Sequence, residues 1–164
     1  MSDFYTEQLI KKKTTGKDIM IKIAMIALTV LSALVVFIFP MGIILPVALI
    51  VIDVFVFRGL NLEYEYLFVN GDLDIDKIMN KSKRKRVFSM NVADMEVLAP
   101  VNAGELMQFQ RAKVSDYTSN TGNADVYAMV VLEKGVHRKI LFEPNEEIVE
   151  GFYMMAPRKV VRKR

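Results

Sequence analysis

The feature that most constrains this chain is a run of thirty consecutive residues without a charge, from Ile23 to Ile52. Nearly all of them are Ile, Leu, Val, Ala, Met or Phe. As one straight helix the run would reach about 45 Å, whereas the hydrocarbon core of a bilayer is about 30 Å thick and takes roughly 20 helical residues. Pro40 and Gly42 stand in its middle and favour a chain reversal there. The run therefore predicts two membrane-spanning helices, over residues 19–39 and 41–57, joined by a short turn.

Three other interpretations of this run are weaker. A cleaved signal peptide has an apolar region of about 7–15 residues followed by a small-residue cleavage site, and neither property fits this run. One tilted span with a re-entrant half-helix stays open as an alternative. A buried hairpin in the core of a soluble protein fits less well, because neither segment has a polar face.

The charges around the run predict its orientation. Lys11, Lys12, Lys13 and Lys17 precede the run and Arg58 follows it, whereas the predicted turn carries no charge. The positive-inside rule therefore places both termini in the cytoplasm. We expect a multi-pass protein of the cell membrane. Lysines beside a bilayer also attract anionic lipid, although topology alone accounts for these four.

Two ionisable residues, Lys22 and Asp53, fall inside the predicted spans. Ionisable groups within a membrane are functional candidates by default. Alternatively, both lie near the membrane interface, or they pair with each other and clamp the two helices. Counted from the turn they lie at different depths, so such a pair requires staggered helices.

The rest of the chain has the size of one small domain and no excess of positive charge. Residues 61–164 contain 16 basic and 15 acidic residues, so a general nucleic-acid binder is not indicated. Cysteine is absent, which excludes disulfides, a thiol nucleophile and a thiolate metal site. We divide the chain into an N-terminal cytoplasmic segment (1–18), the spans (19–57), a cytoplasmic domain (61–157) and a basic tail (158–164) that we expect to be mobile.

A β-hairpin is the clearest element of the predicted domain. Apolar and polar residues alternate over 62–69 and again over 72–76, and the Asn-Gly pair at 70–71 favours a type I′ turn. Pairing about this two-residue turn sets Phe68 opposite Leu73 and Tyr66 opposite Ile75. The acidic residues then share the other face, which we expect to be solvated and partly neutralised by the basic residues that follow. They are Glu63, Glu65, Asp72, Asp74 and Asp76, of which Glu65, Asp74 and Asp76 form a candidate partner surface.

The spacing of Asp72, Asp74 and Asp76 matches the start of a calcium-binding loop. Such a loop needs glycine at its sixth position and glutamate at its twelfth. Here those positions hold Lys77 and Lys83. We therefore predict no metal site, and nothing else in the sequence indicates a cofactor.

A basic segment, residues 81–86, contains five cationic residues. A nuclear localisation signal would have this composition, but membrane anchoring argues against it. Three interpretations stay open: a solvated loop, a loop that contacts anionic lipid headgroups, and an electrostatic partner for the acidic hairpin face. Each basic residue near an anionic surface contributes about 1 kcal/mol. The candidates for lipid contact are Lys81, Lys83, Arg84, Lys85 and Arg86.

Short strands followed by one helix complete the predicted domain. Strands are expected over residues 87–92, 94–100, 109–117, 126–132 and 136–142, with a loop or short helical turn at 102–106. The closing helix begins after Asn145 and ends before Pro157. Its predicted apolar face consists of Ile148, Val149, Phe152, Tyr153 and Met155. The fold class is thus a membrane α-hairpin plus a mainly β domain, an antiparallel barrel or sandwich of about six or seven strands with a C-terminal helix.

This order of elements resembles the bacterial pleckstrin-homology-like (PH-like) domains, with the hairpin of residues 64–75 at its start and the helix of residues 145–155 at its end. The resemblance covers residues 62–157, and the whole layout is similar to uncharacterised members with two membrane helices ahead of the domain. No diagnostic residue motif supports it. The resemblance implies a binding or scaffold module whose ligands are mostly unknown. The spans make the bilayer one expected partner, and anionic lipid headgroups and a protein or a second copy are candidate partners. In lipid-binding eukaryotic relatives the basic cluster lies in the first hairpin loop, which here is predicted at residues 70–71, flanked by acid.

No catalytic site is indicated by the sequence. The one histidine, His137, lies on a predicted strand, and nucleophile-elbow, P-loop, zinc-protease and dinucleotide-binding motifs are absent. A membrane-tethered hydrolase that uses Glu63, Glu65 or Asp76 stays open as a third class, although a sheet face open to water gives no reason for perturbed carboxyl pKa values. We therefore predict a non-enzymatic module. The alternative is a small transporter or channel accessory subunit with a regulatory cytoplasmic domain, which the ionisable residues in the spans motivate.

Overall fold

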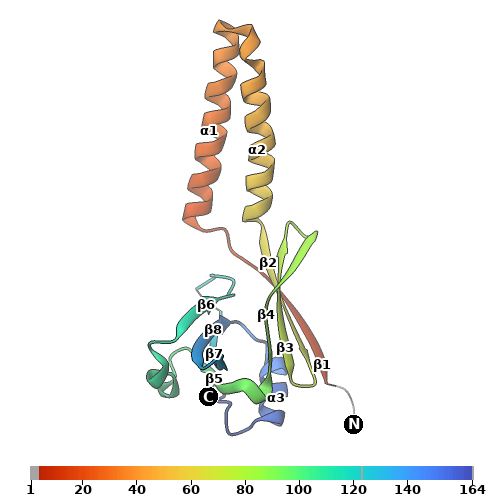
Figure 1. The fold of residues 1–164 in the computed structure, drawn as a ribbon, viewed down its shortest axis with the longest axis vertical. Helices are drawn as coiled ribbons and strands as arrows, with labels where there is room; N and C mark the ends of the chain where they lie inside the picture. Colours follow the sequence, from red (N-terminus) through yellow and green to blue (C-terminus); the bar gives the residue numbers. More distant parts are fainter. Residues whose placement is uncertain (1–3, 123, 164) are drawn as a thin grey trace.

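The structure, a computed structural model, describes residues 4–122 and 124–163. A long helical hairpin stands out from a β domain (Figure 1). The hairpin contains α1 (Gly16–Ile38), the short 3-10 helix η1 (Pro40–Ile43) and α2 (Ile44–Leu60), and we call these elements together the apolar hairpin. The two helices predicted over residues 19–39 and 41–57 are confirmed. Each extends further at its domain end than the sequence pattern predicts.

Local chemistry explains where α1 begins and ends. The Thr15 hydroxyl accepts a hydrogen bond from the Asp18 N–H, and the Asp18 carboxylate accepts one from the Thr15 N–H at 2.8 Å, which forms a capping box. At the other end, Phe39 leaves the helical conformation and Pro40, which lacks an N–H, begins η1. The reversal therefore lies where the sequence predicts it.

The apolar hairpin has the surface of a candidate membrane segment. Its two arms, α1 and η1 with α2, are long and apolar enough to cross a bilayer. Only 6 % and 11 % of their most apolar stretches are buried within the structure. A core helix of a soluble domain would bury an apolar stripe against its neighbours, so these helices do not behave as core helices.

The first sheet has the strand order β1-β2-β3-β4. Its strands are β1 (Tyr5–Lys11), β2 (Leu62–Val69), β3 (Asp72–Met79) and β4 (Lys83–Asn91). The sequence pattern predicts no strand within residues 1–18, yet β1 pairs antiparallel with β2 and sets Lys11 opposite Glu63. The apolar hairpin is therefore inserted between two neighbouring strands of one sheet and does not simply precede the domain.

The insertion changes which loop is the first of the domain. β1 and β2 form the first hairpin, and the apolar hairpin is their connection. The assignment of the Asn70-Gly71 turn as the first hairpin loop is therefore wrong, because it joins β2 to β3. The β2–β3 hairpin itself is confirmed, with Phe68 opposite Leu73. Both turn residues have positive φ, 48° and 97°, as a type I′ turn requires.

The second sheet has the order β5-β7-β8-β6 and one parallel pair. Its strands are β5 (Met95–Pro100), β6 (Lys113–Asp116), β7 (Tyr127–Glu133) and β8 (Val136–Phe142), with the 3-10 helices η2 (Val92–Asp94) and η3 (Gly104–Phe109) between them. β6 runs parallel to β8, which corrects the expectation of a wholly antiparallel domain. The strand predicted over 109–117 is shorter because Phe109 ends η3. Eight strands are present in the described residues, and β7 is internal as predicted.

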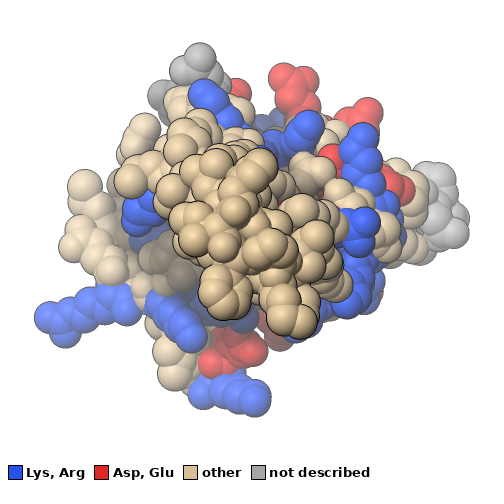
Figure 2. Space-filling model, turned by 90° about the horizontal axis from the view of Figure 1, so that it is seen from above, with Lys and Arg blue, Asp and Glu red and all other residues tan. Residues whose placement is uncertain are grey.

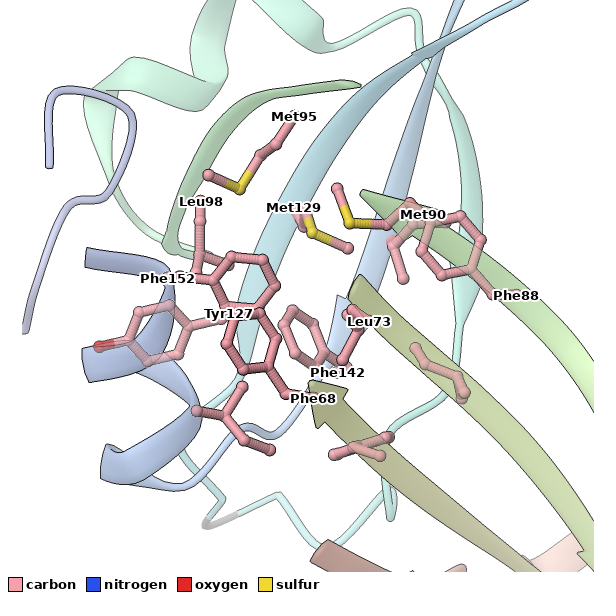
Figure 3. Close-up of a cluster of buried hydrophobic side chains, with 14 of the residues drawn as sticks. Phe68, Leu73, Phe88, Met90, Met95, Leu98, Tyr127, Met129, Phe142 and Phe152 are labelled. Carbon is pink, nitrogen blue, oxygen red and sulfur yellow. The ribbon is translucent and has the colours of Figure 1, made fainter. Parts of the chain in front are cut away.

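The helix α3 (Glu146–Met155) closes the core between the sheets. The Asn145 side chain caps it by accepting a hydrogen bond from the Ile148 N–H at 2.9 Å. Ile148, Val149 and Phe152 are buried as predicted, whereas Tyr153 and Met155 are exposed. Figure 3 shows the aromatic and methionine side chains that fill the core. Within this core the centroids of the Phe68 and Phe152 rings are 4.5 Å apart.

The chain after α3 is held against the second sheet. The Leu98 N–H donates to the Lys159 carbonyl, and the Val161 N–H donates to the Leu98 carbonyl, both at 2.8 Å. Val160 between them is buried. The prediction of a mobile tail is therefore wrong for residues 158–161. Arg164, the last residue of that predicted tail, lies outside the described residues.

Candidate binding surface at the base of the apolar hairpin

The basic segment, residues 81–86, lies beside the base of α2. The turn between β3 and β4 is formed by Asn80, Lys81 and Ser82, and the first two have positive φ. The Asn80 N–H donates a hydrogen bond at 2.9 Å to the carbonyl of Asn61, the residue that follows α2. In Figure 1 the tip of the β3–β4 hairpin accordingly stands next to the lower end of α2. All six residues of the basic segment are exposed.

The two arginines of the basic segment are bound to the acidic face of the first sheet. Arg84 pairs with Glu65 at 2.7 Å. Arg86 pairs with Asp74 at 2.9 Å and with Asp76 at 3.2 Å. Side chains alternate along a strand, so Arg84 and Arg86 point to one face of β4 together. Of the three interpretations of this segment, an electrostatic partner for the acidic hairpin therefore holds for its arginines.

Most of the acidic face is buried, which corrects the expectation of a solvated surface; of its five residues, Asp72 is exposed and Asp74 is half-buried. Glu63, Glu65 and Asp76 are only 7 %, 5 % and 8 % exposed. For Glu63 and Glu65 the reason is β1, which makes β2 an internal strand and sets Leu9 beside Glu65. Asp76 lies on β3, where Glu65 and Arg86 are its neighbours on either side. Burial raises the pKa of the Glu65 carboxyl, and the Arg84 guanidinium offsets part of this rise.

The lysines of the basic segment lie on the opposite face of β4 from its arginines. Lys83 and Lys85 alternate with Arg84 and Arg86, and Lys85 is directly opposite Lys77 of β3. Like charges opposite each other destabilise a sheet, so an anion placed between them would relieve repulsion. None of these lysines, nor Lys81, has a carboxylate within 4.0 Å in the part of the chain that is described. These four lysines form the candidate anion-binding surface, which we call the lysine surface: Lys77, Lys81, Lys83 and Lys85.

Sequence reasoning located the basic segment but missed Lys77 and the division between lysines and arginines. The division arises because β4 begins at Lys83, within the segment that was expected to be a loop, so its side chains alternate between the two faces. The place of Lys77 opposite Lys85 depends on the β3–β4 register, which contains an irregularity between Ile75 and Asp76. A strict alternation from the hairpin turn does not reveal such a shift.

Other basic residues lie around the base of the hairpin. Seen from the side of the helices, Lys and Arg side chains surround the uncharged outer part of the apolar hairpin (Figure 2). On the α1 side, the Lys12 N–H donates to the Leu62 carbonyl at 3.0 Å and the Lys13 N–H to the Ser119 carbonyl at 2.7 Å. The chain on both sides of the hairpin is therefore fastened to the β domain.

The structure does not bring Lys22 and Asp53 together. The Thr29 hydroxyl donates to Asp53 Oδ2 at 2.7 Å, and no ion pair to Lys22 exists within 4.0 Å among the described side chains. Since Thr29 faces Asp53, Lys22 lies seven residues, about 10 Å, closer to the domain. Side chains tilt toward the N-terminus of their helix, so Lys22 leans toward the domain and Asp53 toward the hairpin turn. The predicted intramolecular pair is wrong for this reason.

No arrangement of residues suited to a metal emerges where side chains are described. Residues 4–122 and 124–163 contain no group of three or more His, Cys, Asp or Glu that could hold a metal ion. His137 is exposed on β8 with its ring 5.0 Å from that of Phe109. That the chain needs no cofactor stays a prediction.

The comparison with known proteins agrees with this architecture. No curated protein and no solved structure matches the chain. A family model described as "Bacterial PH-like domain (DUF6106)" matches residues 2–162, so it includes β1, the apolar hairpin and both sheets. The chain therefore belongs to this family of bacterial PH-like domains.

Proposed function

We propose that this protein is a membrane-anchored, non-enzymatic binding module at the cytoplasmic face of the bacterial cell membrane. The apolar hairpin crosses the bilayer twice, and both termini are cytoplasmic. The lysine surface contacts the phosphate groups of anionic lipid. The β domain is thereby held in one orientation against the membrane.

The dimensions and connections of the apolar hairpin support two crossings. Its arms of 23 and 21 residues span about 31–35 Å as helices, close to the hydrocarbon thickness of about 30 Å. Both arms join neighbouring strands of one sheet, with Lys11 opposite Glu63. The two ends must then lie on the same side of the membrane, and the lysines beside them favour the cytoplasmic side.

The observation that carries the lipid contact is the bond between Asn80 and Asn61. It fixes the β3–β4 turn to the residue that ends α2, where the chain leaves the bilayer. One residue separates α2 from β2, so the domain cannot swing far from the surface. The lysine surface then lies within a Debye length of about 8 Å. At about 1 kcal/mol for each lysine, four of them contribute up to about 4 kcal/mol.

A protein partner or self-association on the acidic hairpin face remains a further prediction from the sequence. Such a partner must displace Arg84 from Glu65 and Arg86 from Asp74 and Asp76. Lipid contact through the lysines requires no such exchange.

The test uses the absence of native cysteine. Ser82→Cys is labelled with an environment-sensitive fluorophore, and the full chain is reconstituted in vesicles of neutral lipid with or without phosphatidylglycerol. We expect a blue shift that depends on the anionic lipid and disappears when Lys81, Lys83 and Lys85 are replaced by serine. Met154→Cys, on α3 at the far end of the domain (Figure 1), is the control label and should not respond. Equal spectra of the Ser82 label in both vesicles would refute the lipid contact.

A second candidate function, an accessory subunit of a transporter or channel, is favoured by the buried Asp53 within the hairpin. Replacing Lys22 and Asp53 by leucine tests it. Unchanged cellular function with intact membrane insertion would exclude this role.

A further inference from the structure

Asp53 carries the one buried side-chain nitrogen or oxygen atom without a hydrogen-bond partner in the described part of the chain. The residue is 8 % exposed, in the seam between α1 and α2. Its Oδ2 accepts the hydrogen bond from Thr29, whereas its Oδ1 is buried and has no hydrogen-bond partner. The hydroxyl of Ser32, which is also buried on α1, donates to the Thr29 carbonyl at 2.7 Å. Only one of the two carboxylate oxygens of Asp53 therefore has a hydrogen-bond partner within the hairpin.

Such a half-satisfied carboxylate is costly in apolar surroundings. A buried charge is normally paired or fully hydrogen-bonded, and ionisable groups inside a membrane pair with one another. Asp53 lies seven residues before Leu60, the last residue of α2. If the hairpin spans the bilayer, as the proposed function holds, Asp53 is about 10 Å from the cytoplasmic end of its span.

We propose that Asp53 is the docking point for a third membrane helix, from another protein, that carries a lysine or arginine at this depth. The cation pairs with the carboxylate through Oδ1 while Thr29 continues to hold Oδ2. Because Oδ1 is buried in the free hairpin, docking of the third helix has to include a rotation of the Asp53 side chain that turns Oδ1 toward the incoming cation. This inference rests on the proposed two-span insertion but not on the lipid contact.

Neither this chain nor a second copy supplies the cation. Lys22 lies about 10 Å nearer the domain and leans away from Asp53. In a symmetric pair of chains the Lys22 of the second copy also lies about 10 Å nearer the domain than Asp53. The two Asp53 carboxylates would lie at equal depth and repel each other. Between residues 19 and 57 no other cationic residue occurs. The partner is therefore a different chain.

The experiment measures binding of designed membrane helices to the full chain in neutral-lipid vesicles. The probe is a leucine-rich single span with one lysine about 10 Å from its cytoplasmic end, and the control probe has leucine at that position. Energy transfer from a fluorophore at Met154→Cys reports association. Interhelical polar contacts contribute about 1–2 kcal/mol in model peptides, so we expect the lysine probe to bind about tenfold more tightly than the leucine probe.

Variants of Asp53 and Thr29 separate charge from other causes. Asp53→Leu and Asp53→Asn should both abolish the preference for the lysine probe, because only the carboxylate pairs with a cation. Thr29→Val keeps the carboxylate and should keep the preference. Equal binding of both probes, or a preference that survives Asp53→Leu or Asp53→Asn, would overturn the proposal. Resistance of each chain to carbonate extraction is checked first, and extraction of the unmodified chain would contradict the two-span insertion itself.

Discussion

Replacing Gly151 by alanine should destabilise the protein, although helix propensity alone predicts the opposite. Gly151 is buried on α3 and faces the first sheet. A Cβ atom at this position would lie 2.5 Å from Cε1 of Phe4 and 2.6 Å from Cε1 of Phe68. Carbon atoms pack best at about 3.5–4.0 Å, so both rings must move by about 1 Å.

The magnitude follows from two opposing contributions. Overpacking a dense core costs about 1–3 kcal/mol, and two displaced rings place this substitution near the upper end. The higher helix propensity of alanine compared with glycine stabilises the folded state by about 1 kcal/mol. We therefore expect Gly151→Ala to lower the free energy of unfolding by about 2 kcal/mol.

The assay is denaturant unfolding of the full chain in detergent, followed by tyrosine fluorescence because the chain lacks tryptophan. Gly104→Ala is the matched control, since a Cβ there meets nothing within 4 Å. Phe4→Ala makes room on one side and should reduce the cost of Gly151→Ala by at least about 0.5 kcal/mol in a double-mutant cycle. A Gly151→Ala protein as stable as the unmodified one would refute the packing of residue 4 and β2 against α3.

Two further substitutions probe how β1 is joined to the domain. The Gln8 side chain donates to the Glu143 carbonyl at 2.9 Å and accepts from the Asn145 N–H at 2.7 Å, so Gln8→Ala should cost about 1–3 kcal/mol in the same unfolding assay; no change would mean that β1 is not docked there. Because burial by β1 raises the pKa of Glu65 above its ordinary 4.5, the folded state holds the Glu65 proton more tightly than the unfolded state. The protonated Glu65 carboxyl therefore contributes fully to the free energy of unfolding below pH 4.5. This contribution is lost as the pH rises through the raised pKa of the folded state. The free energy of unfolding is measured for the unmodified and the Glu65→Gln proteins at a series of pH values, and the Glu65→Gln protein should not show this loss. Parallel pH profiles of the two proteins would contradict the raised pKa of Glu65.

The elements that were predicted correctly are those whose signal is local. An uncharged run interrupted by Pro40 predicts two helices wherever the rest of the chain lies. The Asn70-Gly71 turn fixes its own register, and the Asn145 cap marks the start of α3. In each case the residues that determine the structure are neighbours in the sequence.

The features that were missed depend on pairing between distant segments. β1 has a mixed pattern of polar and apolar residues and becomes a strand by pairing with β2, more than fifty residues later. The burial of Glu65 follows from that pairing. The parallel contact of β6 with β8 and the ion pairs of Arg84 and Arg86 with the acidic residues of β2 and β3 likewise depend on how separate strands pair.

Labelling of single cysteines in intact cells tests the membrane topology most directly. Met41→Cys, in the turn of the apolar hairpin, should react with a membrane-impermeant maleimide added outside. Ser82→Cys, beside the lysine surface, should react only after the membrane is permeabilised. Two membrane spans with both termini in the cytoplasm predict this opposite behaviour. Reaction of Ser82→Cys from outside, or of Met41→Cys only after permeabilisation, would contradict this topology.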